Sequence, residues 1–443
     1  MTHLKPSAEL AWEFSRFIMA LFMRLPPSLR ILSALGFSAL SPVLAEPFLF
    51  SPVSEAPEWR LLDESQGKIT REEFESRLTT VFDPGGALRP YLLWDDGGVT
   101  LFRDTVRNHP LYRLTFAPAG DVPSLPPLVL GDPARPLAGK VICLDPGHIG
   151  GDWADLEERS FRIGTDRPVV EGELNLRVCR ILERKLEEAG ATVVWTHAGQ
   201  EPTTPLRPGD LYPEAITYLL QGAAGTRLPR LSANRLIRWN AELLFYRSAE
   251  IQARARRVNE ELRPDLTLCI HFNAAPWPGG RIRLTSANRL VLFVHGSYTR
   301  EELAYDDQKF RLLRKLLEGA TPLELGISAA IADRFREGWG FPPENYADSG
   351  YSHATGQSPY VWYRNLIANR MFDGPVVFVE GPYMNDRDVY PWIQAGEYEG
   401  ARRMAGRLRG NVYREYAELV AQGVTDFFRR QAESPSGFTN YSR

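Results

Sequence analysis

The sequence has few of the residues that build covalent cross-links or thiolate sites. Its 443 residues contain only three cysteines, Cys143, Cys179 and Cys269, and each lies inside an apolar segment. Such a sparse, odd set gives no disulfide framework. No C-x-x-C pair occurs that would indicate a thiolate metal site. We therefore expect three buried thiols, and we look for functional chemistry elsewhere.

A strong excess of charge is also lacking, because the formal net charge is only -3. This gives no electrostatic reason to expect nucleic acid or an anionic membrane as the partner. The sequence also contains no H-E-x-x-H pattern, no Walker loop and no G-x-S-x-G nucleophile elbow. These absences narrow the range of possible enzyme classes.

The apolar stretch near the N-terminus is too short for an ordinary membrane span. Residues 31–45, ILSALGFSALSPVLA, fall below the roughly 20 apolar residues that a spanning helix needs. Arg24 and Arg30 precede this stretch, and its small-residue end resembles a signal-peptide cleavage site. We interpret residues 1–45 as a signal peptide or N-terminal anchor, with Met23 as an alternative start. The protein is then expected to be exported, to the periplasm or cell envelope.

The rest of the chain is predicted to fall into an accessory region and a catalytic domain. A helical pattern and an Asp-Gly-Gly hairpin signal precede a connector rich in proline and glycine. The predicted divisions are an accessory domain and Pro-rich linker over 46–135, a catalytic domain over 136–432, insertions at about 198–248 and 297–360, and a flexible tail over 433–443.

Beyond residue 135, short apolar runs alternate with amphipathic helices, a pattern typical of a sheet covered on both faces. We expect an α/β fold, a three-layer α/β/α domain with a mostly parallel sheet, preceded by a small mixed α+β accessory domain. The runs begin at residues 141, 191, 266, 289 and 375.

Three of these apolar runs end in polar side chains that can do chemistry. VICLDPGH leads to His148, LTLCIH to His271, and PVVFVE to Glu380. Open α/β sheets bind their ligands at the carboxyl ends of the strands. A single histidine at a strand end is more often a hydrogen-bonding or surface residue, and Glu380 could simply be exposed or salt-bridged. Three such residues together form a candidate site.

The motifs resemble those of the zinc-dependent N-acetylmuramoyl-L-alanine amidases of amidase family 3, over roughly residues 139–430. The matching stretches are LDPGHIGGD, VVEGELNLRV, LCIHFNA and VFVEGPYMND, in that order. The resemblance implies that His148, Glu171 and His271 bind Zn2+ and that Glu380 is the catalytic residue. Two imidazoles and one carboxylate leave a fourth position on zinc open, as catalytic sites require.

Some positions depart from the family pattern. Ile149 stands where the family usually has glycine, and the segment between the first and second ligands is long. Glu173 is a rival to Glu171, although the distance to the following Asn-Leu pair fits Glu171 better. His197 replaces a family arginine. Arg254 and Asn259 match the family's R-x-x-x-x-N helix.

The resemblance implies hydrolysis of the amide bond that joins the lactyl group of N-acetylmuramic acid to the L-alanine of the stem peptide. The expected partner is peptidoglycan rather than nucleic acid. The accessory domain or the insertions leave room for contact with a cell-wall or regulatory protein. Two alternatives stay open: a zinc peptidase on the same scaffold, and a non-catalytic peptidoglycan-binding module. We expect residues 297–360 to border the cleft, and His109, His197, His295 and His353 to be structural or surface residues.

Overall fold

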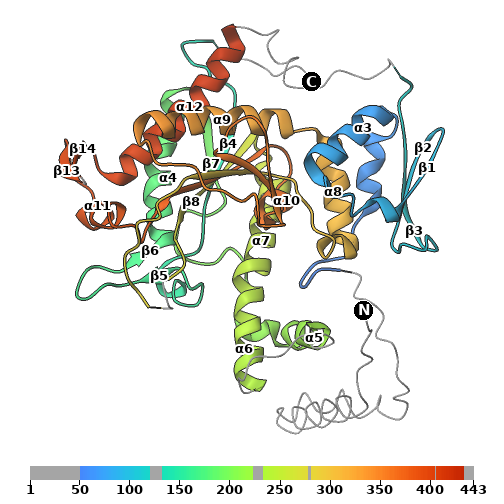
Figure 1. The fold of residues 1–443 in the computed structure, drawn as a ribbon, viewed down its shortest axis with the longest axis horizontal. Helices are drawn as coiled ribbons and strands as arrows, with labels where there is room; N and C mark the ends of the chain where they lie inside the picture. The colour runs from blue at the N-terminus through green and yellow to red at the C-terminus, as the bar shows by residue number, and fades with distance from the viewer. Residues whose placement is uncertain (1–49, 120–131, 223–232, 278–280, 405, 434–443) are drawn as a thin grey trace.

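The computed structural model describes residues 50–119, 132–222, 233–277, 281–404 and 406–433 (Figure 1). The predicted leader over residues 1–45 and nearly all of the predicted tail lie outside the described residues. Among the helices that the structure describes, none is long and apolar enough to cross a membrane.

Within the described residues, seven strands form the central sheet, in the order β10-β11-β9-β12-β8-β4-β7. β4, β7, β8 and β12 run parallel to one another. β9 is antiparallel to β12 and parallel to β11, and β10 is antiparallel to β11. The predicted mostly parallel sheet is confirmed. The strands are β4 (Val141–Pro146), β7 (Thr192–Trp195), β8 (Leu266–Asn273), β9 (Val291–Val294), β10 (Ser352–Ala354), β11 (Val361–Arg364) and β12 (Val376–Tyr383).

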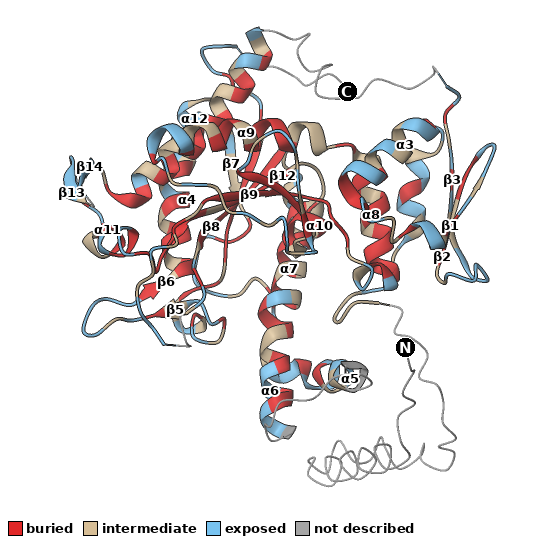
Figure 2. Cartoon of the chain, viewed as in Figure 1, coloured by how far each residue is buried: buried red, intermediate tan, exposed pale blue. Residues whose placement is uncertain are grey.

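Helices cover both faces of this sheet, which gives the predicted three layers (Figure 1). One face carries α4 (Glu171–Glu188), α9 (Thr321–Gly338) and α12 (Val412–Glu433), and α12 packs against both of the others. The other carries α7 (Glu250–Arg256) and α10 (Ile367–Met371). Figure 2 shows the buried residues concentrated on the sheet and on the helix surfaces that face it.

α4 shows how the sequence pattern produces this packing. Its buried positions include Leu174, Val178, Leu182 and Leu186, which recur at helical spacing. The helix ends just before Gly190, whose φ of 105° suits a residue without a side chain. β4, α4 and β7 therefore form a βαβ unit.

The N-terminal region packs against the segment that follows β9. It contains α3 (Arg71–Arg77), extended by η2 (Leu78–Phe82), and a sheet of β1 (Leu92–Asp95), β2 (Gly98–Phe102) and β3 (Pro110–Thr115). The β1-β2 hairpin has the predicted Asp-Gly-Gly turn. The backbone N–H groups of Ser297 and Tyr298 donate to the carbonyls of Val81 and Phe82. This region also touches α8 (Asp306–Glu318), where Arg103 forms an ion pair with Asp306 at 2.8 Å.

The segment predicted as the first insertion is largely helical. It contains η5 (Pro208–Leu211), α5 (Tyr212–Gly222) and α6 (Ala233–Leu244). α6 continues through η6 (Phe245–Ala249) into α7 and η7 (Arg257–Leu262), so one helical stretch runs from residue 233 to residue 262. Figure 1 shows this helical column extending away from the sheet, with α5 beside its far end.

The remaining described elements are short. They include the β5 (Ser160–Phe161) and β6 (Val169–Val170) pair before α4, the helix α11 (Val389–Ala395), and the hairpin of β13 (Arg402–Met404) and β14 (Arg407–Arg409).

Candidate active site

His148 lies on the loop that follows β4, in a strained backbone conformation. Its φ is 65°, in the left-handed region that non-glycine residues seldom adopt. The buried Arg254 guanidinium donates to the carbonyls of His148, at 3.0 Å, and Pro146, at 2.8 Å. It also contacts Asp145 at 3.1 Å. Arg254 therefore satisfies the loop carbonyls and holds the strained turn in place, which explains a basic residue at this point of α7.

Gly147 allows that loop to pass directly beneath the second imidazole. An ideal Cβ at this position would lie 2.2 Å from Cε1 of His271. The Gly147 N–H donates to the carbonyl of Ile270 at 2.8 Å, and the Asn175 side chain donates to the Gly147 carbonyl at 2.9 Å. The glycine of the D-P-G-H motif is required by this close approach.

His271 and Glu380 stand opposite each other on adjacent parallel strands. They are direct partners in the register of β8 and β12, so their side chains emerge on the same face of the sheet. The Phe378 ring stacks on His271 with centroids 4.3 Å apart, and the Tyr416 hydroxyl donates to the His271 carbonyl at 2.7 Å. Both strands continue past these residues, so neither side chain ends its strand as the sequence suggested.

Glu171 is the first residue of α4, where a carboxylate is favoured by the helix dipole. Its Oε1 lies 3.2 Å from Nε2 of His148 and 3.2 Å from Nδ1 of His271. The structure brings Glu171, rather than Glu173, to the two imidazoles. Gly172 permits this, because an ideal Cβ there would lie 2.7 Å from the Gly150 backbone nitrogen.

These three side chains fit a zinc ion. One donor atom from each of His148, Glu171 and His271 lies within 4.8 Å of the other two. Tetrahedral zinc with ligand distances near 2.0–2.1 Å places its ligands about 3.3 Å apart. The two contacts of Glu171 match that spacing. Two nitrogens and one oxygen are also a donor set that catalytic zinc sites use.

The electrostatics of Glu171 agree with this fit, whereas zinc would have to displace a proton from His148. Burial opposes the ionised form of Glu171, but the His148 and His271 imidazoles outweigh it and hold its pKa well below the usual range. The carboxylate is thus ionised at neutral pH, as metal binding requires. Burial likewise opposes protonation of His148, but Glu171 and Glu157 raise its pKa to about 9.

Glu380 has a different environment. Its burial, and then the negative charge of Glu171, raise its pKa to about 8, although Arg159, His148 and Arg364 act in the opposite direction. A carboxyl group with a pKa near neutrality is suited to proton transfer.

Glu157 is a site residue that the sequence analysis missed. Its Oε1 lies 3.4 Å from Nδ1 of His148, the ring nitrogen that faces away from Glu171. The carboxylate also accepts hydrogen bonds from the backbone N–H groups of Ile149 and Gly150 at 3.0–3.2 Å. No sequence signal separates it from its acidic neighbours in the long segment before Glu171. Arg159, from the same segment, lies 3.7 Å from Oε2 of Glu171.

Ile149 has a structural role that accounts for its departure from the family pattern. It is buried in a cluster with residues of the first insertion, among them Leu211, Ala241 and Phe245. Trp153, on the same loop, packs against Phe245 with ring centroids 5.2 Å apart. A large apolar residue after His148 therefore attaches the loop that carries His148 to the helical segment over residues 208–249.

The other histidine and asparagine residues of the predicted motifs and loops form hydrogen bonds with nearby backbone or side-chain groups. His197 contacts the carbonyls of Pro146 and Gly199. Asn259 bonds the backbone at Met371 and Asp373, and Asn385 bonds both backbone groups of Ala275. His109 contacts Asp104, His295 contacts Tyr298, and His353 contacts the Thr80 carbonyl. The three cysteines are buried and unpaired, as expected.

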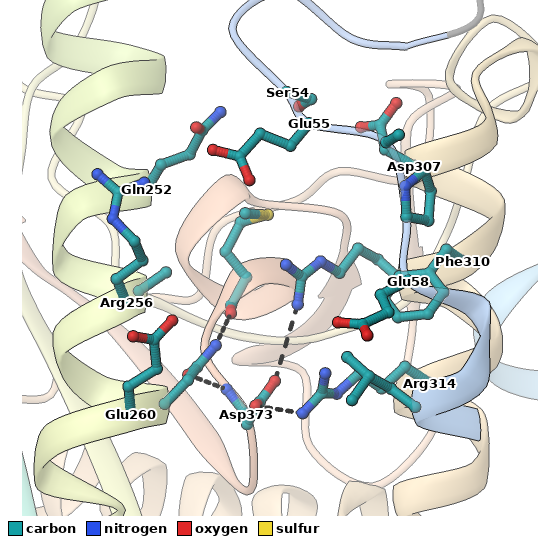
Figure 3. Close-up of a pocket in the computed structure, with 17 residues that line it drawn as sticks. Ser54, Glu55, Glu58, Gln252, Arg256, Glu260, Asp307, Phe310, Arg314 and Asp373 are labelled. Carbon is teal, nitrogen blue, oxygen red and sulfur yellow. Dashed lines mark hydrogen bonds and ion pairs between the residues drawn. The ribbon is translucent and has the colours of Figure 1, made fainter. Parts of the chain in front are cut away.

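A separate cavity of about 440 Å³ lies between the N-terminal segment, α7 and α8 (Figure 3). It is lined by none of the four candidate site residues. Among its charged side chains, Asp373 pairs with Arg314 and Arg311, and the Asp373 backbone N–H donates to the Asn259 side chain at 2.8 Å. This cavity is therefore distinct from the candidate active site.

No protein-family model and no curated protein sequence matches the chain. Several solved structures are similar to it. One is the amidase Ami1 of Mycobacterium smegmatis, an N-acetylmuramyl-L-alanine amidase, with 14% identity, a TM-score of 0.37, and coverage of 67% of this chain and 99% of that one.

Two others cover similar shares of the chain. CwlD amidase of Clostridioides difficile, solved in complex with the GerS lipoprotein, has 13% identity and a TM-score of 0.35, and covers 65% of this chain and 98% of that one. N-acetylmuramoyl-L-alanine amidase AmiC2 of Nostoc punctiforme has 14% identity and a TM-score of 0.34, and covers 66% of this chain and 98% of that one. These structures are of the class that the motifs resemble. At such identities and TM-scores the likeness carries no conclusion about activity.

Proposed function

We propose that this protein is a zinc-dependent N-acetylmuramoyl-L-alanine amidase, which hydrolyses the amide bond between N-acetylmuramic acid and L-alanine in peptidoglycan. The observation that carries the proposal is the convergence of His148, Glu171 and His271 within 4.8 Å, with Glu380 directly beside His271 on the neighbouring strand. The four motifs that resemble amidase family 3 supply these same four residues.

His148, Glu171 and His271 would hold the zinc ion. When bound, zinc supplies Lewis acidity, which polarises a carbonyl group and makes water more acidic. The residues of the chain itself position the ligands and supply the charge of the site. Glu171 supplies the negative charge at the start of α4, Glu157 contacts the far nitrogen of His148, and Arg254 holds the loop that carries this histidine.

Glu380 would transfer the proton. Its carboxylate accepts a proton from the attacking water as the oxygen bonds to the lactyl carbonyl carbon. It then gives the proton to the nitrogen of L-alanine as the C–N bond breaks, which leaves a free amine and a lactyl carboxylic acid that releases its remaining proton to solvent. A positioned acid or base of this kind typically contributes about 10²- to 10⁴-fold in rate.

The test is mass spectrometry of purified peptidoglycan incubated with the zinc-loaded chain. We expect stem peptides with free L-alanine amino termini, together with peptide-free glycan. The chelator-treated chain should give neither product, and zinc should restore both. Cleavage between two amino acids would instead identify a peptidase. Zinc binding without any product would identify a binding module.

Export to the periplasm or cell envelope forms part of this proposal, because the substrate lies outside the cytoplasmic membrane. Residues 46–135 are proposed as an accessory domain with its linker. Their contacts with the segment after β9 make them a candidate route for a regulatory or cell-wall partner to influence the catalytic domain. Deletion of residues 1–45, with the cellular location of the protein as readout, tests the export signal separately.

A further inference from the structure

The register of the sheet places one more charged residue on the same face as the candidate site. Glu380 and Phe378 alternate along β12 and share a face. Phe293 of β9 is directly opposite Phe378, and Trp362 of β11 is directly opposite Phe293. Arg364 follows two residues after Trp362, so its side chain emerges on this face as well.

A continuous row of rings connects the site to that arginine. The Phe378 ring stacks on His271 at 4.3 Å and lies 6.3 Å from the Phe293 ring. The Arg364 guanidinium carbon lies 5.2 Å from the centre of Phe293. The second insertion adds Tyr346, whose ring centre lies 5.7 Å from the same carbon.

Arg364 has aromatic neighbours and its charge acts on Glu380, but it forms no ion pair within the described residues. Its guanidinium carbon also lies 4.7 Å from the Tyr351 ring centre. In the part of the chain that the structure describes, no carboxylate lies within ion-pair distance of it. Arg159 is by contrast already beside Glu171, at 3.7 Å. Aromatic rings orient a guanidinium while leaving its N–H groups available for planar anions.

We propose that Arg364, held by Phe293, Tyr346 and Tyr351, binds a free carboxylate of the substrate's stem peptide and so determines which stem peptides are accepted. The inference rests on the proposed amidase function. Guanidinium and carboxylate groups fit each other through two parallel hydrogen bonds. The arginine comes from β11 and the tyrosines from the second insertion, so this part of the site is built by strands and loops outside the four motifs.

The distance is suitable for a carboxylate close to the scissile bond. Continued past its last pairs, the register aligns the Arg364 backbone with Val376, but the guanidinium lies over Phe293. Phe293 is one strand and two residues from Glu380, about 8 Å at about 4.8 Å per strand and about 3.4 Å per residue. An extended peptide advances about 3.3–3.6 Å per residue. The carboxylate that Arg364 reaches is therefore one carried within the first three residues of the stem.

The experiment compares two synthetic muramoyl tripeptides that differ only in their free carboxylates, which are intact in one and converted to carboxamides in the other. We expect the unaltered chain to prefer the carboxylate form in kcat/KM. In Arg364→Met, kcat/KM for the carboxylate form should fall by about 10- to 100-fold, mainly through KM, and for the carboxamide form by less than about twofold. Arg364→Lys should keep part of the preference.

Arg402→Met is the matched control. Arg402 also lies against an aromatic ring, with its guanidinium carbon 4.2 Å from the centre of Tyr398, but it belongs to the β13-β14 hairpin. It should leave the preference between the two tripeptides unchanged. Equal losses on both tripeptides in Arg364→Met would overturn the inference, since they would indicate a structural role.

Calorimetric binding of the two tripeptides separates this inference from the proposed function. A carboxylate preference that Arg364→Met abolishes supports the inference, even when no amide bond is cut. Equal dissociation constants for the two tripeptides with the unaltered chain overturn it, even when the chain is an active amidase. This last comparison needs no variant and therefore holds if Arg364→Met does not fold.

Discussion

Glu157 and Glu171 contact opposite nitrogens of the same imidazole. Glu157 lies 3.4 Å from Nδ1 of His148, and Glu171 lies 3.2 Å from Nε2. A carboxylate behind a metal-binding histidine fixes the ring and its tautomer, and keeps the other nitrogen available for the metal. The strained backbone of His148 makes such support more necessary, because the ring is carried by a loop rather than by a strand.

Substitution of Glu157 should therefore weaken metal binding without removing a ligand. We expect Glu157→Gln to lower zinc affinity by about 10- to 100-fold, measured by competition with a chromophoric chelator. The neighbouring Glu158 is exposed, so Glu158→Gln is the matched control and should bind zinc normally. Equal zinc affinities of Glu157→Gln and the unaltered chain would show that the loop orients His148 without this carboxylate.

Substitution of Glu380 should lower turnover without weakening zinc binding. Glu380→Gln keeps the shape of the side chain but cannot accept and return a proton. We expect kcat to fall by about 10²- to 10⁴-fold while the zinc content, measured by atomic emission, stays at the level of the unaltered chain. Glu344→Gln, in the loop beside Tyr383, is a control for a nearby carboxylate outside the proposed proton transfer. Turnover of Glu380→Gln near that of the unaltered chain would exclude its proposed role.

The sequence predicted the two histidines and Glu380 because each belongs to an apolar run that the sheet buries, and parallel strands bring their carboxyl ends to one edge. Glu171 was predicted only through the resemblance of VVEGELNLRV to the family motif, with Glu173 as its rival. The structure places all four side chains together, and their roles remain predictions. The three-layer fold followed from the same alternation of apolar runs and helices.

Glu157 and Arg364 could not be found in the same way. Glu157 belongs to an irregular segment in which acidic residues follow one another, and only the folded loop decides which of them meets His148. Arg364 depends on strand order: β11 follows β9 in the sheet, and β9 is antiparallel to β12. Nothing local to RLVLFV or YVWYR encodes that pairing, because it results from how the long segment between the two strands packs.

Gly147 should tolerate no side chain. Its conformation is not left-handed, so the cost of Gly147→Ala comes from the contact of the new Cβ with the His271 imidazole. We expect the free energy of unfolding to fall by about 1–3 kcal/mol and zinc affinity to fall as the ring is displaced. Gly209→Ala is the control, because an ideal Cβ there meets no heavy atom within 4 Å. Denaturant titration and the chelator competition measure the two effects; unchanged values would mean that the loop moves away at little cost.

The stability of the fold should depend on pH through Glu324, far in sequence from the proposed zinc ligands. This residue of α9 is buried, and its Oε1 accepts a hydrogen bond from the Val376 backbone at 2.9 Å. Burial raises its pKa from 4.5 to about 7, although Lys315 opposes the shift. Between these two values the folded chain holds a proton that the unfolded chain has lost. The stabilising contribution is therefore complete below about pH 4.5 and disappears as the pH rises through about 7.

At about 1.4 kcal/mol per pKa unit, this corresponds to a loss on the order of 3 kcal/mol between pH 4.5 and 8. Glu324→Gln keeps the acceptor oxygen and removes the titration, so its unfolding free energy should fall less over this range than that of the unaltered chain. Glu337→Gln, on the same helix but with its side chain 55% exposed, should retain the full dependence. Denaturant titrations from pH 5 to 8 measure the difference, and parallel curves for Glu324→Gln and the unaltered chain would show that Glu324 is ionised in the folded state throughout.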